Sequence, residues 1–101
     1  MKKGNKRHKD INTWENVSFL LSSSWRRNIL RVLESPKTPT QIRKELNMNP
    51  AHVTRTLKQL HQNKMIESLT PTKRQGKLFI TAKEGKELLE KAEKIINKSK
   101  T

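Results

Sequence analysis

The chain has 101 residues, of which 23 are Lys or Arg, 9 are Asp or Glu and none is Cys. This length supports one small domain, and the net charge of +14 favours a polyanionic partner, nucleic acid before an acidic membrane surface. The missing cysteines exclude a disulfide framework and a Cys-ligated zinc site, and no apolar run approaches the ~18–20 residues of a membrane span.

The chain divides by composition into an arm, one domain and a short tail. Residues 1–11 are expected to form a flexible basic arm, because they hold five basic residues, one acid and no apolar periodicity. The arm lacks the apolar stretch of a secretory signal, so a cytoplasmic location is expected. One folded domain is predicted over residues 12–97 and a disordered tail over 98–101. Because only 31% of the residues are hydrophobic, a second subunit is expected to complete a modest core.

Two helices are predicted before the first proline. Asn12 and Glu15 form a capping-box pattern in front of apolar residues at helical spacing. The serines at 22–24 are expected to end this helix and to cap a second one. The second helix is expected to end before Ser35, because a residue that precedes proline avoids the helical conformation. The aromatic side chains of these helices are expected in the core rather than at a cofactor. They are Trp14, Phe19 and Trp25.

The next two helices have the punctuation of a helix-turn-helix. Thr38 is expected to cap the first, with Pro39 in its first position and Gln41 closing a capping box. Asn47 suits a left-handed helix end, and Asn49 caps the second helix, which begins at Pro50 and runs to about Asn63. Only three residues separate the two helices, as is typical of a helix-turn-helix.

A basic hairpin and a last helix complete the domain. Segments 65–70 and 78–81 have strand character, and the loop 71–77 between them is basic. Thr81 and Glu84 form a third capping-box pattern in front of the last helix. The predicted fold class is therefore mainly α (α+β), a winged helix-turn-helix with a two-stranded wing and flanking N- and C-terminal helices.

The helix 50–63 is predicted to enter the major groove of DNA. At ~100° per residue, Val53, Leu57 and Leu60 share one side and must face the core, which leaves an outward face without acids. Arg can pair bidentately with guanine and Gln with adenine, and wing cations can follow the backbone or enter the minor groove. The predicted DNA contacts are Asn49, Ala51, His52, Thr54, Arg55, Lys58, Gln59 and Gln62 in the helix region and Lys73, Arg74, Gln75 and Lys77 in the wing.

The last helix is predicted to contact a second subunit. Its charges largely neutralise one another in i,i+4 pairs such as Glu87 with Lys91, so it is a poor candidate for DNA contact. Its wide apolar stripe can pack on its own core or on a partner, and a homodimer is expected. The stripe is Leu88, Leu89, Ala92, Ile95 and Ile96.

No catalytic, cofactor or metal site is predicted, so the chain is not expected to be an enzyme. His52 and His61 are nine residues apart on one helix and point roughly 180° apart, so they cannot share a metal within a subunit. Neither a glycine-rich phosphate loop nor a ligand pocket is evident in the sequence.

Several stretches resemble small archaeal winged-helix transcriptional regulators related to the MarR and ArsR-type groups. These stretches are 25–30, 53–60, 65–71, 76–81 and 84–88. The resemblance implies a commonly dimeric winged helix-turn-helix with its second motif helix in the major groove. By position it makes Thr54 and Arg55 major-groove contacts and Lys73, Arg74 and Lys77 wing contacts. Asn63 and Lys64 stand where relatives usually turn with a glycine.

The leading hypothesis is a sequence-selective transcriptional regulator that binds double-stranded DNA as a homodimer and is associated with the nucleoid in the cytoplasm. One alternative is an architectural, chromatin-type protein of low selectivity, because counterion release alone gives useful non-specific affinity. Another is a winged-helix module that binds RNA or protein. The acid-free helix face argues against a protein partner.

Overall fold

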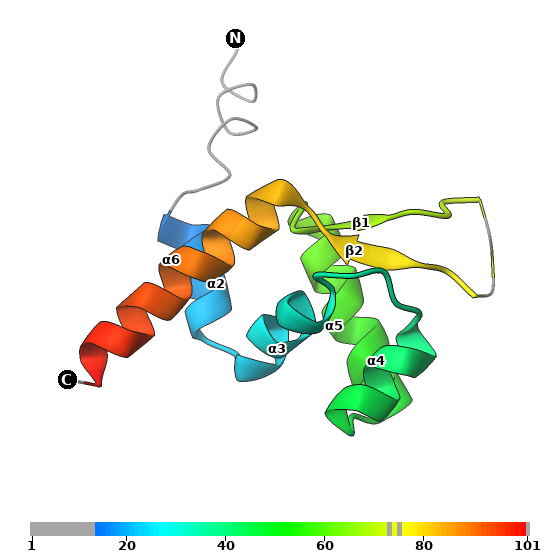
Figure 1. Cartoon of the computed structure of the whole chain (residues 1–101), viewed down its shortest axis with the longest axis horizontal. Coiled ribbons are helices and arrows are strands. Elements are labelled where there is room, and N and C mark those ends of the chain that lie inside the picture. Colours follow the sequence, from blue (N-terminus) through cyan, green and yellow to red (C-terminus); the bar gives the residue numbers. More distant parts are fainter. Residues whose placement is uncertain (1–13, 73, 75, 101) are drawn as a thin grey trace, which may run out of the picture.

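The computed structural model of the chain describes residues 14–72, 74 and 76–100. Within these residues, five helices surround one buried core, and a two-stranded antiparallel sheet extends from it as a wing (Figure 1). This arrangement confirms the predicted winged helix-turn-helix. The elements are α2 (Trp14–Leu21), α3 (Ser24–Val32), α4 (Pro39–Leu46), α5 (Pro50–Gln62), β1 (Ile66–Ser68), β2 (Phe79–Thr81) and α6 (Lys83–Ser99).

The ends of α4 and α5 are made by the predicted caps. Thr38 accepts a hydrogen bond from the Gln41 backbone while the Gln41 side chain accepts one from the Thr38 backbone at 2.8 Å. Asn47 ends α4 in the left-handed conformation, with φ 55° and ψ 48°. The Asn49 side chain accepts a hydrogen bond from His52 N at 2.8 Å and starts α5. These local interactions confirm the predicted turn between the two motif helices, whereas the predicted Asn12 cap lies outside the described residues.

A third extended segment joins the wing, and the sequence did not reveal it. In the hairpin Ile66 pairs with Thr81 and Ser68 with Phe79. Lys37 lies beside Phe79 on the other edge, where the two backbones exchange hydrogen bonds of 3.1 and 3.0 Å. The segment that leads into α4 is thereby attached to β2, so the helix-turn-helix and the wing share one backbone network.

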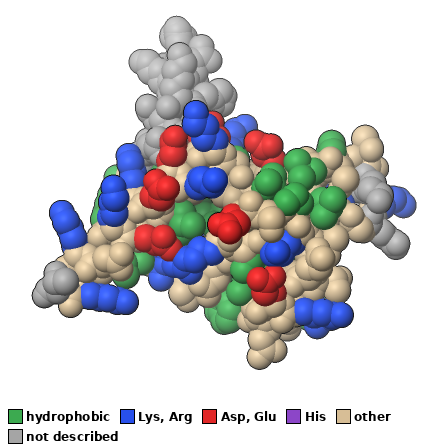
Figure 2. Space-filling view, in the orientation of Figure 1, with side chains coloured by type: hydrophobic (Ala, Val, Ile, Leu, Met, Phe, Trp, Pro, Cys, Tyr) green, Lys and Arg blue, Asp and Glu red, His purple; other side chains and the backbone are tan. Residues whose placement is uncertain are grey.

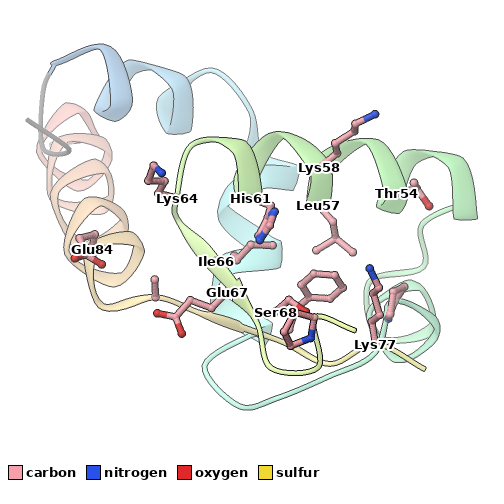
Figure 3. Close-up of a pocket in the computed structure, with 14 residues that line it drawn as sticks. Thr54, Leu57, Lys58, His61, Lys64, Ile66, Glu67, Ser68, Lys77 and Glu84 are labelled. Atoms are coloured by element: carbon pink, nitrogen blue, oxygen red, sulfur yellow. The ribbon is translucent and has the colours of Figure 1, made fainter. Parts of the chain in front are cut away.

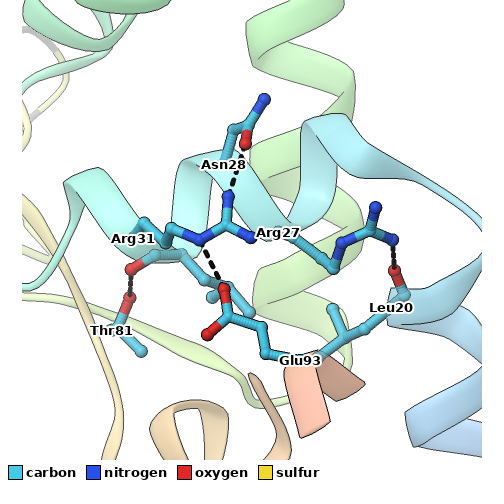
Figure 4. Close-up of polar contacts among 7 residues, drawn as sticks. Leu20, Arg27, Asn28, Arg31, Thr81 and Glu93 are labelled. Carbon is cyan, nitrogen blue, oxygen red and sulfur yellow. Dashed lines mark hydrogen bonds and ion pairs between the residues drawn. The ribbon is translucent and has the colours of Figure 1, made fainter. Parts of the chain in front are cut away.

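The start and end of α6 differ from the prediction. Thr81 does not cap the helix, because its hydroxyl donates to the Leu30 carbonyl oxygen at 2.8 Å and α6 begins at Lys83 after an Ala82 without a side-chain cap. The contact between Thr81 and α3 is drawn in Figure 4. The helix then continues to Ser99, so the start of the expected tail at 98–101 is helical.

The two tryptophans are not in the core, contrary to expectation. Trp14 is 65% exposed at the first residue of α2, where Val17 and Leu20 occupy the buried side of the helix. Trp25 is 38% exposed at the start of α3. Phe19 does pack against the edge of the core. The core is therefore aliphatic. Its fully buried side chains are Leu20, Ile29, Leu30, Leu33, Ile42, Val53, Leu60, Met65 and Leu88.

The apolar stripe of α6 is mostly used within the protomer. Leu88, Leu89 and Ala92 are buried where α6 packs on α2 and α3. The prediction that these three side chains contact a partner subunit is wrong, because α2 already covers them. Ile95 and Ile96 are half-buried and keep part of their surface exposed. No helix among the residues that the structure describes is long and apolar enough to cross a membrane.

Candidate nucleic-acid interface

Helix α5 presents a polar face away from the core. Val53, Thr56, Leu57 and Leu60 are buried on its inner side. At ~100° per residue, the opposite side spans about one third of the helix circumference. Every side chain on it is exposed, and none is acidic. The members of this outward face are Ala51, Thr54, Arg55, Lys58 and Gln62. Because the face is convex, basic and amide-bearing, it can enter a groove and donate hydrogen bonds to bases or phosphates.

Two predicted contacts lie on the side of α5 that faces α3 instead. Gln59 Oε1 accepts hydrogen bonds from Arg26 Nε and Nη2, each at 3.4 Å. The His52 ring meets Trp25 edge-to-face with 5.4 Å between ring centroids. Placing Gln59 on the outward face was therefore wrong. Its oxygen is occupied by Arg26, so the bidentate pairing with adenine that needs this oxygen as acceptor is not available in this arrangement.

The N-terminus of α5 offers hydrogen-bond donors beside the outward face. Asn49 is exposed, and its side-chain oxygen is occupied by the cap to His52 N. The donors that remain are the side-chain NH₂ group of Asn49 and the backbone N–H of Ala51 in the first turn. Donors of this kind at a helix N-terminus bind phosphate oxygens.

The wing contributes cations on the other side of α5. Arg74 is exposed in the loop and Lys77 is half-buried near its base, while Gly76 turns the chain with φ 67°. Lys73 and Gln75, also predicted contacts, lie outside the described residues. Of the four predicted wing residues, Lys77 is placed beside α5, where it lines the same cavity as Thr54 and Lys58.

A cavity of about 890 Å³ lies between α5 and the wing, although the sequence showed no pocket. Figure 3 shows Leu57 and His61 pointing from α5 toward the wing, with Lys77 rising from the wing toward α5. Lys58 also borders the cavity but extends outward from α5. The cavity is lined by apolar side chains, Phe79 among them, and by both basic groups such as Lys77 and the acidic groups of Glu67 and Glu84.

Lys64 also lines this cavity, and it was not among the predicted site residues. It adopts φ 61°, the left-handed conformation that favours glycine. The resemblance had already marked this turn, since it implies a glycine in the place of Asn63 and Lys64. His61 was missed because only its place beside the wing, 6.4 Å from the Phe79 ring, makes it part of the site.

Three arginines outside the motif are engaged within the protein. Arg27 Nη1 donates to the carbonyl oxygen of Leu20 at 2.7 Å (Figure 4) and to that of Leu21 at 3.0 Å. Arg31 pairs with Glu93 of α6, and Arg26 holds Gln59. Lys and Arg side chains are intermixed with acidic ones along α6 (Figure 2). The total charge therefore includes cations that are engaged within the protein. The positive charge around the outward face of α5 indicates the interface more directly.

Comparisons with known proteins identify the family and the fold. Residues 26–100 match a family described as winged helix-turn-helix. A comparison with curated proteins found no match. Among solved structures, a double mutant of Lactococcus lactis ZitR is 26% identical, with a TM-score of 0.64 over 75% of this chain and 53% of ZitR. The chain thus spans about half the length of that protein.

Some of the similar structures contain DNA, among them a ZitR mutant and a MarR mutant. A single mutant of Lactococcus lactis ZitR in complex with DNA is 26% identical, with a TM-score of 0.59 over 67% of this chain and 48% of ZitR. A mutant MarR from E. coli complexed with operator DNA is 20% identical, with a TM-score of 0.68 over 94% of this chain and 69% of MarR. The second likeness is one of fold. These neighbours support the winged helix-turn-helix fold, while kinship with MarR, ArsR-type and archaeal regulators stays a prediction.

Proposed function

Since the chain belongs to the winged helix-turn-helix family, we propose that it is a transcriptional regulator that binds double-stranded DNA selectively, with α5 in the major groove. One observation carries the proposal: the exposed, acid-free outward face of α5 is flanked by a helix N-terminus on one side and by a basic wing on the other. A helix fits the width of the B-DNA major groove, and the flanking donors match the phosphates on its two edges.

Within this proposal Arg55 and Gln62 read base edges, and Lys58 approaches either a base or a phosphate. Arg55 is central on the outward face, where a guanidinium can pair with both acceptors of guanine. Thr54 and Ala51 are small enough to let the backbone of α5 approach the bases. Arg74 and Lys77 contact the phosphate backbone or the minor groove. The solved complex of a ZitR mutant with DNA supports DNA as the partner.

We further propose that the active form is a homodimer associated with the nucleoid. Two copies related by a two-fold axis would read a pseudo-palindrome whose half-sites are about 34 Å apart. The apolar surface available for the contact is smaller than the sequence indicated. Among the described residues it includes Trp14 of α2 and Ile95 and Ile96 of α6, each of which keeps part of its surface exposed.

Selection of bound fragments from a random duplex pool at about 0.15 M salt tests the proposal. We expect a motif with two-fold symmetry. Arg55→Ala should reduce the preference for that motif over random DNA by roughly 5- to 150-fold, the equivalent of ~1–3 kcal/mol. Lys86→Ala, an exposed substitution on α6, is the control and should bind as the unmodified protein does.

A low-selectivity architectural protein is the second candidate, and the net charge of +14 is the observation that favours it. In that case no motif would be enriched, and Arg55→Ala would weaken cognate and random duplexes equally. Binding of duplex RNA without binding of DNA would exclude both proposals, because the deep and narrow major groove of RNA does not admit a helix.

A further inference from the structure

The side chain of Arg26 lies where three helices meet. From the first turn of α3 it reaches back to the end of α2, where Nη1 donates to the Phe19 carbonyl oxygen at 2.8 Å and to Ser22 Oγ at 3.0 Å. On its other edge Nε and Nη2 both donate to Gln59 Oε1 of α5 at 3.4 Å. One guanidinium group therefore bridges α2 and α5.

The position of this guanidinium is constrained by more than hydrogen bonds. Its Cζ atom lies 3.8 Å from the centre of the Phe19 ring, in a cation–π arrangement. Burial between the helices also lowers the pKa of Arg26 from its ordinary value. The planar fork of arginine allows it to hold the carbonyl, hydroxyl and amide acceptors at once, whereas the point charge of a lysine cannot span them.

Arg27 is a natural comparison for Arg26. It also donates to carbonyl oxygens at the end of α2, those of Leu20 and Leu21. Both arginines thus satisfy backbone groups that a helix C-terminus leaves unpaired. Of the two, only Arg26 has a described hydrogen bond to α5. A substitution at Arg27 therefore removes a comparable helix cap and leaves the bridge between α2 and α5 intact.

We infer that Arg26 is a positioning residue that sets the orientation of α5 relative to the α2–α6 pair. α5 packs directly on α3, α4 and β1, while α2 packs on α6 and α3. The two ends of Arg26 connect these groups of helices through Gln59 and Phe19. Without the bridge α5 keeps its hydrophobic packing on α3, but a polar restraint on its angle is lost.

The consequence for DNA rests on the proposed function. If two copies associate through the α2–α6 side, the angle between that side and α5 decides how far apart the two recognition helices lie. A fixed angle selects one spacing of half-sites, and a looser angle accepts several. Arg26 would then control the spacing preference without contacting DNA.

The first test measures the angle directly and needs no DNA. The chain has no cysteine, so Glu15→Cys and Gln62→Cys place one spin label on an exposed site of α2 and one on α5. Pulsed electron resonance then gives the distribution of distances between the labels, with unlabelled protein added to separate signals within a subunit from those between subunits. We compare Arg26→Met with Arg27→Met, each in the labelled background.

The inference predicts a broader or shifted distance distribution for Arg26→Met and an unchanged one for Arg27→Met. A second pair keeps the test valid if Arg26→Met unfolds. Gln59→Leu removes only the α5 end of the bridge and should also broaden the distance distribution. Gln59→Glu retains an acceptor for Arg26 and should give the same distribution as the protein with Gln59. Equal distributions for Arg26→Met and Arg27→Met, or no change with Gln59→Leu, would overturn the inference.

The second test selects half-site spacing from a pool in which two copies of the bound motif are separated by variable numbers of base pairs. The unmodified protein should enrich a single spacing, and Gln59→Leu should enrich several. Failure of the unmodified protein to enrich any motif counts against the proposed function. A single sharp spacing for both proteins counts against the positioning role alone, so the two failures are distinguishable.

Discussion

Gly85, in the first turn of α6, lies against the backbone of Met65, the residue before β1. The substitution Gly85→Ala tests how closely these two segments pack. A Cβ atom on residue 85 would lie 2.1 Å from the Met65 carbonyl oxygen and 2.9 Å from its carbonyl carbon. Contacts under 3.0 Å essentially never occur for real Cβ atoms, so the backbones must separate by about 0.9 Å or more. Both obstructing atoms belong to the backbone and cannot rotate away.

The expected cost follows from what this separation disturbs. The Met65 carbonyl oxygen accepts a hydrogen bond from Ala82 N at 3.0 Å, whose loss costs about 0.5–1.5 kcal/mol. Overpacking the buried start of α6 costs roughly a further 1–3 kcal/mol. The better helix propensity of alanine offsets up to about 1 kcal/mol. The free energy of unfolding should therefore fall by about 0.5–3.5 kcal/mol, although propensity alone predicts a gain.

Urea unfolding followed by circular dichroism measures this change. The midpoint for Gly85→Ala should move to lower urea at an unchanged slope. Lys86→Ala, at the exposed neighbouring position, should stay within about 0.5 kcal/mol of the unmodified protein. A Gly85→Ala protein as stable as the unmodified one would show that the close approach of α6 to Met65 does not exist in solution.

Three further predictions concern the motif and its charges. Lys64→Gly should raise the free energy of unfolding by about 0.5–1 kcal/mol, because it relieves the left-handed conformation at φ 61°, and a loss in urea unfolding would contradict this. Thr38→Ala should lower that free energy by about 1 kcal/mol through loss of the α4 cap, and an unchanged thermal midpoint would contradict the role of the cap. Lys58→Ala should reduce the slope of log affinity against log salt by about 1, while Arg27→Met, whose guanidinium is engaged with α2, should leave that slope unchanged in DNA titrations. Equal slopes for the two variants would show that Lys58 is not near a phosphate.

The local features of the motif could be predicted from the residues themselves. Thr38 with Gln41, Asn47 and Asn49 each act over three or four neighbouring positions, and the structure shows each in the predicted role. The order of helices and the hairpin follows from the same short-range signals. The core side of α5 was predictable because Val53, Leu57 and Leu60 repeat at the helical period and leave the opposite face polar.

Other features depend on which segments meet. The capping pattern at Thr81 predicts that its hydroxyl bonds to the first turn of α6. In the structure the hydroxyl donates instead to the Leu30 carbonyl oxygen of α3, at 2.8 Å. Trp14 has the right spacing for a buried residue, yet it begins α2 where the core ends. The helical period predicts that Leu88, Leu89 and Ala92 are covered by another element, but only the packing of α2 against α6 decides that this element belongs to the same protomer.

The interface shows the same division. Composition and helical period identify Arg55, Lys58 and Gln62 as exposed side chains on a groove-sized helix, because these properties belong to α5 alone. Gln59 lies only about 60° around the helix from Gln62. Its side-chain oxygen accepts hydrogen bonds from Arg26, which is 33 residues earlier in the chain. A side chain's periodicity determines the direction in which it leaves its helix, but the partner that it meets there is a property of the tertiary structure.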